Sequence, residues 1–136
     1  MKTTLDRSGR SPLHYAACDG NSALVASLIK QGHDVSLSDK AGWTPLHFAA
    51  QASSVECARL LLDADAQIDA EDSNGNTPLS TAVFESKGFG DLIVFLLSRG
   101  SDPEKENHHG QSPIGLARLI ANYDLLPYFR KKPDGA

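Results

Sequence analysis

Histidine is the residue type in this sequence that best suits metal binding or acid–base chemistry, and two histidines are adjacent. His108 and His109 stand between Asn107 and Gly110, in a segment with the composition of a turn. Adjacent side chains rarely converge on one ion unless a third ligand lies nearby. We therefore predict no metal site, and a metal-dependent or enzymatic subunit that uses His108 and His109 stays as an alternative hypothesis.

The other patterns with chemical potential are weaker. Gly88-Phe89-Gly90 lacks the third glycine and the preceding strand that a nucleotide-binding loop requires. Cys18 and Cys57 are far apart in the sequence, and neither has a second cysteine nearby that would make a zinc site or a redox pair. We predict reduced thiols, no catalytic residue and no cofactor.

The elements that position these residues belong to a folded domain. The chain has 136 residues, of which 40% are hydrophobic, which is enough for one compact domain. Its formal charge of -4 opposes nucleic-acid binding, because neutralising phosphates requires an excess of Lys and Arg. The apolar run at 92–97 is too short to span a membrane, and the first residues lack the apolar stretch of a secretory signal. We expect a cytoplasmic protein without nucleic-acid or membrane partners.

A four-residue motif recurs along the chain at an almost fixed interval. Successive prolines of the motif are 33, 33 and 35 positions apart, so the third unit carries two extra residues. A glycine lies three positions before each proline, and Asp or Asn lies six positions before it. The four copies are Ser11-Pro12-Leu13-His14, Thr44-Pro45-Leu46-His47, Thr77-Pro78-Leu79-Ser80 and Ser112-Pro113-Ile114-Gly115.

Each unit is predicted to form two short helices. Ser or Thr before Pro starts a helix, because the hydroxyl caps free N–H groups and proline at the first helical position loses no hydrogen bond. Alanine pairs such as Ala49-Ala50 allow close stacking, and leucines at i, i+3 and i+4 form a stripe that neighbouring units cover. Asp-x-x-Gly between units is turn chemistry and predicts a protruding hairpin. The predicted class is all-α.

The frame Asp-x-x-Gly-x-Thr-Pro-Leu-His-x-Ala-Ala resembles the ankyrin repeat, over residues 6 to about 130. The resemblance implies an all-α solenoid of stacked helix-turn-helix units with protruding hairpin loops. It predicts a single domain at 1–130, with repeats at about 6–38, 39–71, 72–106 and 107–130, and a short polar tail at 131–136.

The resemblance also gives roles to individual residues. It implies that His14 and His47 tie the helix cap to the loop by hydrogen bonds, which is a structural role. Terminal repeats must face water on their outer side. The polar residues Ser22, Ser27 and Arg118 therefore predict that the first and last repeats cap the stack.

Two further positions carry specific predictions. Asp65 occupies the helix-end position that Gly32 and Gly100 hold, where left-handed backbone is usual, so Asp65→Gly should stabilise the protein. The segment 86–90 lengthens the turn between two helices by two residues. Phe89 in this segment either tucks into a neighbouring repeat or is offered to a partner.

The concave surface that the resemblance implies, formed by hairpin tips and first helices, is the predicted binding site for another protein. Aromatic side chains at its variable positions are candidate anchors of an interface. These are Trp43, Tyr15, Phe48 and Phe84, although each could equally fill space between helices. The polar candidates are Arg7, Arg10, Lys40, Gln51, Asn74, Asn76 and Glu85.

The charge distribution of the sequence predicts the charge of the partner's surface. From Leu60 to Ser86 the sequence has no Lys or Arg but several acidic residues, which would steer a partner with a basic surface. We therefore predict a non-catalytic interaction module, monomeric when free, that acts either as a stoichiometric inhibitor of the toxin-neutralising or immunity type or as a small adaptor. A self-associating structural spacer is a further alternative.

Overall fold

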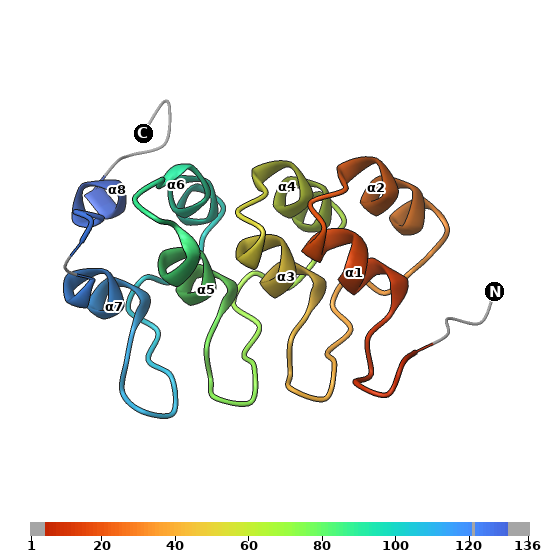
Figure 1. The fold of residues 1–136 in the computed structure, drawn as a ribbon, viewed down its shortest axis with the longest axis horizontal. Coiled ribbons are helices and arrows are strands. Elements are labelled where there is room, and N and C mark those ends of the chain that lie inside the picture. Colours follow the sequence, from red (N-terminus) through yellow and green to blue (C-terminus); the bar gives the residue numbers. More distant parts are fainter. Residues whose placement is uncertain (1–4, 121, 131–136) are drawn as a thin grey trace.

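The computed structural model describes residues 5–120 and 122–130, and within these ranges the chain forms eight helices in four antiparallel pairs. The pairs stack side by side in chain order, and a hairpin loop projects from the same edge of each pair (Figure 1). The predicted polar tail at 131–136 lies outside the described residues. The helices are α1 Pro12–Cys18, α2 Ser22–Lys30, α3 Pro45–Gln51, α4 Val55–Asp63, α5 Pro78–Glu85, α6 Asp91–Ser98, α7 Pro113–Leu119 and α8 Leu126–Arg130.

The first helix of each pair begins where the Ser/Thr-Pro motif predicts. Proline occupies the start of α1, α3, α5 and α7. The side chains of Thr44 and Ser112 accept hydrogen bonds from the backbone N–H three residues later, which caps α3 and α7. Thr77 makes no such cap at α5, and its hydroxyl has no hydrogen-bond partner among the described residues.

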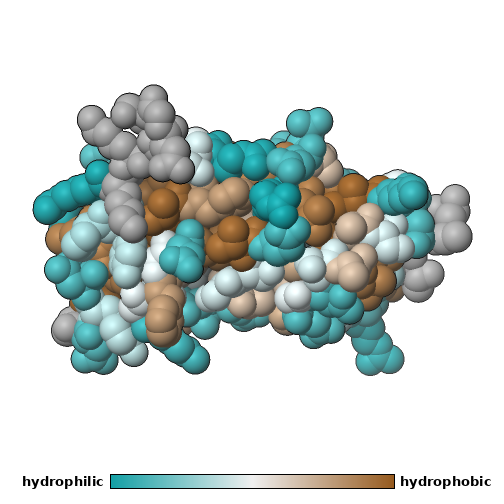
Figure 2. All heavy atoms as spheres, turned by 90° about the horizontal axis from the view of Figure 1, so that it is seen from above, coloured by the Kyte–Doolittle hydropathy of each residue, from teal (hydrophilic) through white to brown (hydrophobic). Residues whose placement is uncertain are grey.

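The core is continuous from one end of the stack to the other. Helices α1, α3, α5 and α7 pack on one another in a row, and α2, α4, α6 and α8 form a second row, which lies above the first in Figure 1. Ala16, Ala17, Ala49 and Ala50 are almost fully buried and let the first row approach closely. Viewed from the second row, apolar residues form a broken band along the stack with polar side chains between them (Figure 2).

Backbone hydrogen bonds join the hairpins as well as the helices. Lys40 N–H donates to the backbone oxygen of Ser8 at 2.8 Å, and Ser73 N–H donates to that of Ala41 at 2.9 Å. The glycine of each Asp-x-x-Gly turn supplies the positive φ angle, +80° at Gly42. The hairpins therefore form a second, hydrogen-bonded layer that holds the repeats in register.

Helix α4 ends in the left-handed conformation that its neighbours reach with glycine. Asp65 has a φ angle of 70°, against 93° at Gly32 and 102° at Gly100. Asp65 N–H donates to Leu62 O and Ala66 N–H to Leu61 O, both at 3.0 Å, so the end of the helix is a Schellman motif. The predicted left-handed position is confirmed.

We expect Asp65→Gly to raise the free energy of unfolding by about 1 kcal/mol, because glycine adopts this backbone without the clash that a Cβ atom brings. Thermal unfolding followed by circular dichroism measures the effect. Arg59→Gly is the control, since Arg59 is exposed and lies inside α4, where glycine costs roughly 1 kcal/mol. A loss of stability in both variants would contradict the prediction.

The two extra residues of the third repeat lengthen the loop between its helices, as predicted: this loop is 86–90, against 19–21 and 52–54 in the first two repeats. Its glycines make room for aromatic rings. A Cβ atom on Gly90 would lie 2.2 Å from Tyr128 Cγ, and Tyr128 Oη donates to Gly88 O at 3.1 Å. Phe89 stays 80% exposed, so it is not tucked into a neighbouring repeat.

Candidate functional site

Two buried histidines lock the first and second repeats to the repeats that follow them. His47 Nδ1 accepts a hydrogen bond from Thr44 N–H at 3.1 Å, and Nε2 lies 3.0 Å from the backbone oxygen of Asn76 in the next repeat. Because a carbonyl can only accept, Nε2 carries the proton. His14 makes the equivalent contacts one repeat earlier. The structural role predicted for His14 and His47 is confirmed.

Neutral imidazole rings suit these contacts. Burial lowers the pKa of both His14 and His47, because a charged ring would lose its hydration in the core. The bridges fix the spacing between successive first helices and hairpins. They therefore set the geometry of the surface that those elements form.

That surface holds a hollow of about 420 Å³ between the second, third and fourth repeats, which we call the central hollow. Phe84 on α5 is its most prominent apolar group, because 69% of this side chain is exposed. Of the predicted site residues, the structure brings five together here: Trp43, Gln51, Asn76, Phe84 and Glu85.

Trp43 combines two roles that the sequence analysis left as alternatives. Its ring centroid lies 5.5 Å from that of His47 and 4.9 Å from that of Phe48, so it packs on its own repeat. It also forms one wall of the central hollow. Phe48 is only 7% exposed, so it supports Trp43 and does not project as an anchor itself.

The remaining predicted residues lie elsewhere. Tyr15 is 44% exposed, and its hydroxyl donates a hydrogen bond to Asp6 in its own repeat. Arg7, Lys40 and Asn74 are exposed at the hairpin tips. These residues do not line the central hollow.

Arg10 is partly exposed and lines a second, smaller hollow of about 130 Å³, which we call the first hollow. Its Nε donates to Asp39 Oδ2 at 3.1 Å, and its Cζ lies 5.1 Å from the ring centroid of Phe48. The hydrogen bond to Asp39 raises the pKa of Arg10. Arg10 therefore already has an ionic partner within its own chain.

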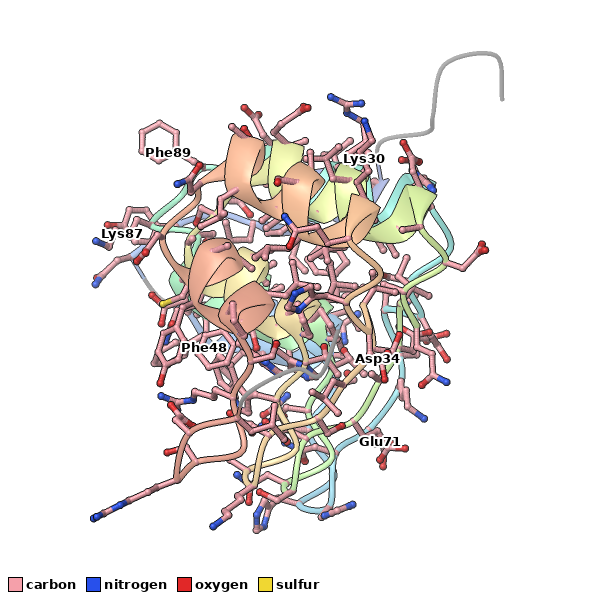
Figure 3. The ribbon with its side chains drawn as sticks, turned by 90° about the vertical axis from the view of Figure 1, so that its right-hand side faces the viewer. Lys30, Asp34, Phe48, Glu71, Lys87 and Phe89 are labelled. Carbon is pink, nitrogen blue, oxygen red and sulfur yellow. The ribbon has the colours of Figure 1, made fainter. Side chains whose placement is uncertain are left out.

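The acidic residues of the middle repeats do not gather at one place. Asp63 pairs with Arg99 at 2.9 Å, and Glu71 pairs with Lys105 at 3.5 Å. In Figure 3, Glu71 lies on the side of the stack opposite Phe48. From the acidic stretch, Asp72 and Glu85 are the residues that line the central hollow.

Asp72 is the charged residue of this site that was not predicted; the other lining residues that were not predicted are Ser80, Thr81, Asn107, Gln111 and Leu116. Its place in Asp-x-x-Gly identified it only as a turn residue, and its Oδ1 does accept the N–H groups of Asn74 and Asn76. An alignment of the repeats could have identified Asp72 as a site residue. Arg10 and Trp43 occupy the same position of successive repeats, so the carboxylate facing Trp43 has no arginine beside it.

The last hairpin carries the histidines considered for metal binding. His108 Nε2 lies 3.8 Å from Glu71 Oε1, which brings two ligand-type groups together. In residues 5–120 and 122–130, no group of three or more His, Cys, Asp or Glu side chains is placed to hold a metal ion. Within the same ranges, no helix has the length and apolarity to cross a membrane.

The central hollow is suited to binding a ligand or a side chain, because apolar walls, carboxamides and two carboxylates surround it. A comparison with protein families finds that the model described as ankyrin repeats (3 copies) matches residues 13–107. This match covers more than half of the chain, and it contains the Trp43 and Phe84 walls of the central hollow. No curated protein matches the sequence.

Proposed function

Because the chain belongs to the ankyrin-repeat family, whose repeats are generally protein–protein interaction modules, we propose that it binds a partner protein through the central hollow and the hairpin tips around it. The observation that carries the proposal is the exposure of Phe84. A phenylalanine with 69% of its side chain exposed at the edge of a hollow loses apolar contact with water when a partner covers it.

The chemistry of the hollow supports a partner with a basic surface. Asp72 and Glu85 line the hollow, and no Lys or Arg is among its lining residues. An aromatic anchor beside uncompensated negative charge favours a partner segment that is both apolar and cationic. The expectation of a basic partner therefore rests on these two residues, since they line the hollow and Asp63 and Glu71 are already paired with cations.

We propose that the chain acts by covering part of the partner's surface. Ankyrin-repeat proteins are typically non-catalytic, so we favour a stoichiometric inhibitor that neutralises a toxin or an enzyme, with a small adaptor as the alternative. One copy of the chain would bind one partner. The two free cysteines, one of them buried in the core, support the cytoplasm as the compartment.

We expect Phe84→Ala to release the captured partner, weakening its binding by roughly tenfold or more, which is the usual effect of removing a central aromatic anchor. The measurement is capture from the source lysate with tagged protein, followed by mass spectrometry and titration of the protein that is retained. Melting curves establish that each variant is folded.

Phe89→Ala is the matched control, because Phe89 is 80% exposed but lies outside the central hollow. Partner binding should survive this substitution. Loss on Phe89→Ala and retention on Phe84→Ala would move the site to the 86–90 loop and overturn the proposal. Once the partner is known, adding the wild-type chain at equal concentration should block the partner's activity if the chain is an inhibitor and leave it intact if the chain is an adaptor.

A further inference from the structure

The first hollow and the central hollow are equivalent positions of successive repeats, and they differ in what fills them. Four of the five residues that line the first hollow have a counterpart 33 positions later among the residues that line the central hollow. Arg10 corresponds to Trp43, Trp43 to Asn76, Phe48 to Thr81 and Gln51 to Phe84. The first hollow has about 130 Å³ of space and the central hollow about 420 Å³.

Beside the first hollow, Arg10 of the chain itself pairs with the carboxylate of the hairpin turn. Asp39 Oδ1 accepts the N–H groups of Ala41 and Trp43 at 2.9 and 2.8 Å, and Asp39 Oδ2 accepts from Arg10 Nε at 3.1 Å. The guanidinium also lies over the ring of Phe48. Both carboxylate oxygens of this buried residue therefore have donors.

In the central hollow the corresponding carboxylate is only half satisfied. Asp72 Oδ1 accepts the N–H groups of Asn74 and Asn76, each at 2.9 Å. Asp72 Oδ2 has no hydrogen bond or ion pair to any residue of the described ranges, although Asp72 is only 8% exposed. Trp43 occupies the repeat position that Arg10 holds in the first repeat, and its side chain carries no charge. Asp72 Oδ2 is not among the buried side-chain atoms of the described residues that lack a partner, so it is open to the hollow, where a cationic donor is its best partner.

At the interface between the third and fourth repeats, the chain itself makes the side-chain contact that Asp72 lacks. Asn107 occupies the position of Asp72 one repeat later, and its Nδ2 donates to Asn76 Oδ1 at 2.8 Å. Of the three interfaces between repeats, within the described part of the chain, the central one is thus the interface in which this side-chain contact is missing. Asp72 Oδ2 is therefore able to accept a donor from outside the chain.

We propose that the central hollow receives an arginine side chain of the partner, whose guanidinium pairs with Asp72 Oδ2 and packs between Trp43 and Phe84. The inference rests on the proposed function and names the chemistry of its partner. Thr81 in the place of Phe48 leaves the space that an entering side chain needs. A planar guanidinium can bind the carboxylate and stack on an aromatic ring at once, which favours arginine over lysine.

The test uses N-acetyl-arginine N-methylamide as the probe. Trp43 is the single tryptophan of the chain, so its indole resonance reports on the hollow without assignment of the other signals. Titration of the wild-type chain should shift this resonance to saturation, with a dissociation constant on the order of millimolar for so small a ligand. N-acetyl-citrulline N-methylamide has the same shape without the charge, and it should bind at least tenfold more weakly.

Two substitutions locate the contact. Asp72→Asn should weaken binding of the arginine probe about tenfold, because it removes a charge-assisted hydrogen bond. Its turn should persist, since Asn107 accepts the same two backbone N–H groups in the last hairpin. Asp39→Asn is the matched control and should leave probe binding unchanged, because Arg10 already covers that carboxylate. Trp43→Arg should abolish probe binding by filling the site from within, read from the Asp72 and Phe84 amide signals.

The outcomes separate this inference from the proposed function. Equal binding of arginine and citrulline probes, or an unchanged titration of Asp72→Asn, overturns the arginine site. If Phe84→Ala releases the partner while Asp72→Asn retains it at full affinity, the hollow is a binding site but not for arginine. If neither variant releases the partner, the proposed function fails, and the inference fails with it.

Discussion

We expect Gly42→Ala to lower the free energy of unfolding by about 2–5 kcal/mol relative to the wild-type chain. Left-handed backbone strain accounts for about 1–2 kcal/mol of this loss, and overpacking accounts for about 1–3 kcal/mol. Gly42 has a φ angle of +80°, and a Cβ atom on it would lie 2.8 Å from the Asp72 Cα and from the Ser73 backbone nitrogen. Those atoms belong to the next hairpin, so the two hairpins would have to separate. The melting temperature should fall by roughly 10 °C.

Gly32→Ala is the control that separates backbone strain from crowding. Gly32 has a φ angle of +93°, but nothing lies within 4 Å of the position its Cβ atom would take. This variant should lose only the backbone term of about 1–2 kcal/mol. Equal losses in the two variants would contradict the crowding argument.

The His47→Leu variant should lose about 2–4 kcal/mol of unfolding free energy, because two hydrogen bonds disappear and a buried N–H is left without an acceptor. Thr44 is 2% exposed, and its N–H donates to His47 Nδ1, so water cannot replace the lost acceptor. Leucine keeps the apolar contacts of the ring, which confines the change to the polar contacts. Chemical denaturation with urea measures the loss.

The same substitution at an exposed histidine tests the explanation. His109 lies at the last hairpin tip and is exposed, so His109→Leu should change stability by less than about 0.5 kcal/mol. A large loss in both variants would show that leucine itself, and not the broken bridge, causes the effect.

Local signals in the sequence predicted the architecture because each is repeated. The interval of the prolines, the glycine before each of them and the apolar blocks after them specify helix pairs and hairpins without reference to distant residues. The roles of His14 and His47 followed from the same frame. Even the departure at Asp65 was readable, because the neighbouring repeats show which backbone conformation the position requires.

The site was less predictable because it depends on which side chain stands beside which, across repeats. Phe48 and Phe84 occupy different positions of the repeat, but the burial of Phe48 depends on its contacts with Arg10 and Trp43, which no local pattern reveals, whereas Phe84 stays exposed. The acidic stretch looked uniform in the sequence, yet contacts to Arg99 and Lys105 neutralise part of it. The packing of Tyr128 on Gly90 joins segments that no local pattern connects.

The third repeat lacks the histidine bridge, and this shapes how the molecule can open. Ser80 stands where His14 and His47 stand, so within the described residues the Thr77 hydroxyl has no hydrogen-bond partner, and the histidine bridge of the first two repeats is replaced by a serine. In a linear array stability is a sum of nearest-neighbour couplings, and the weakest coupling yields first. We therefore expect the fourth repeat, which supplies Asn107 and Leu116 to the central hollow, to detach transiently more readily than it would with a histidine bridge. A partner seated in the hollow spans that weak junction, so its affinity and the cooperativity of the whole array are thermodynamically linked.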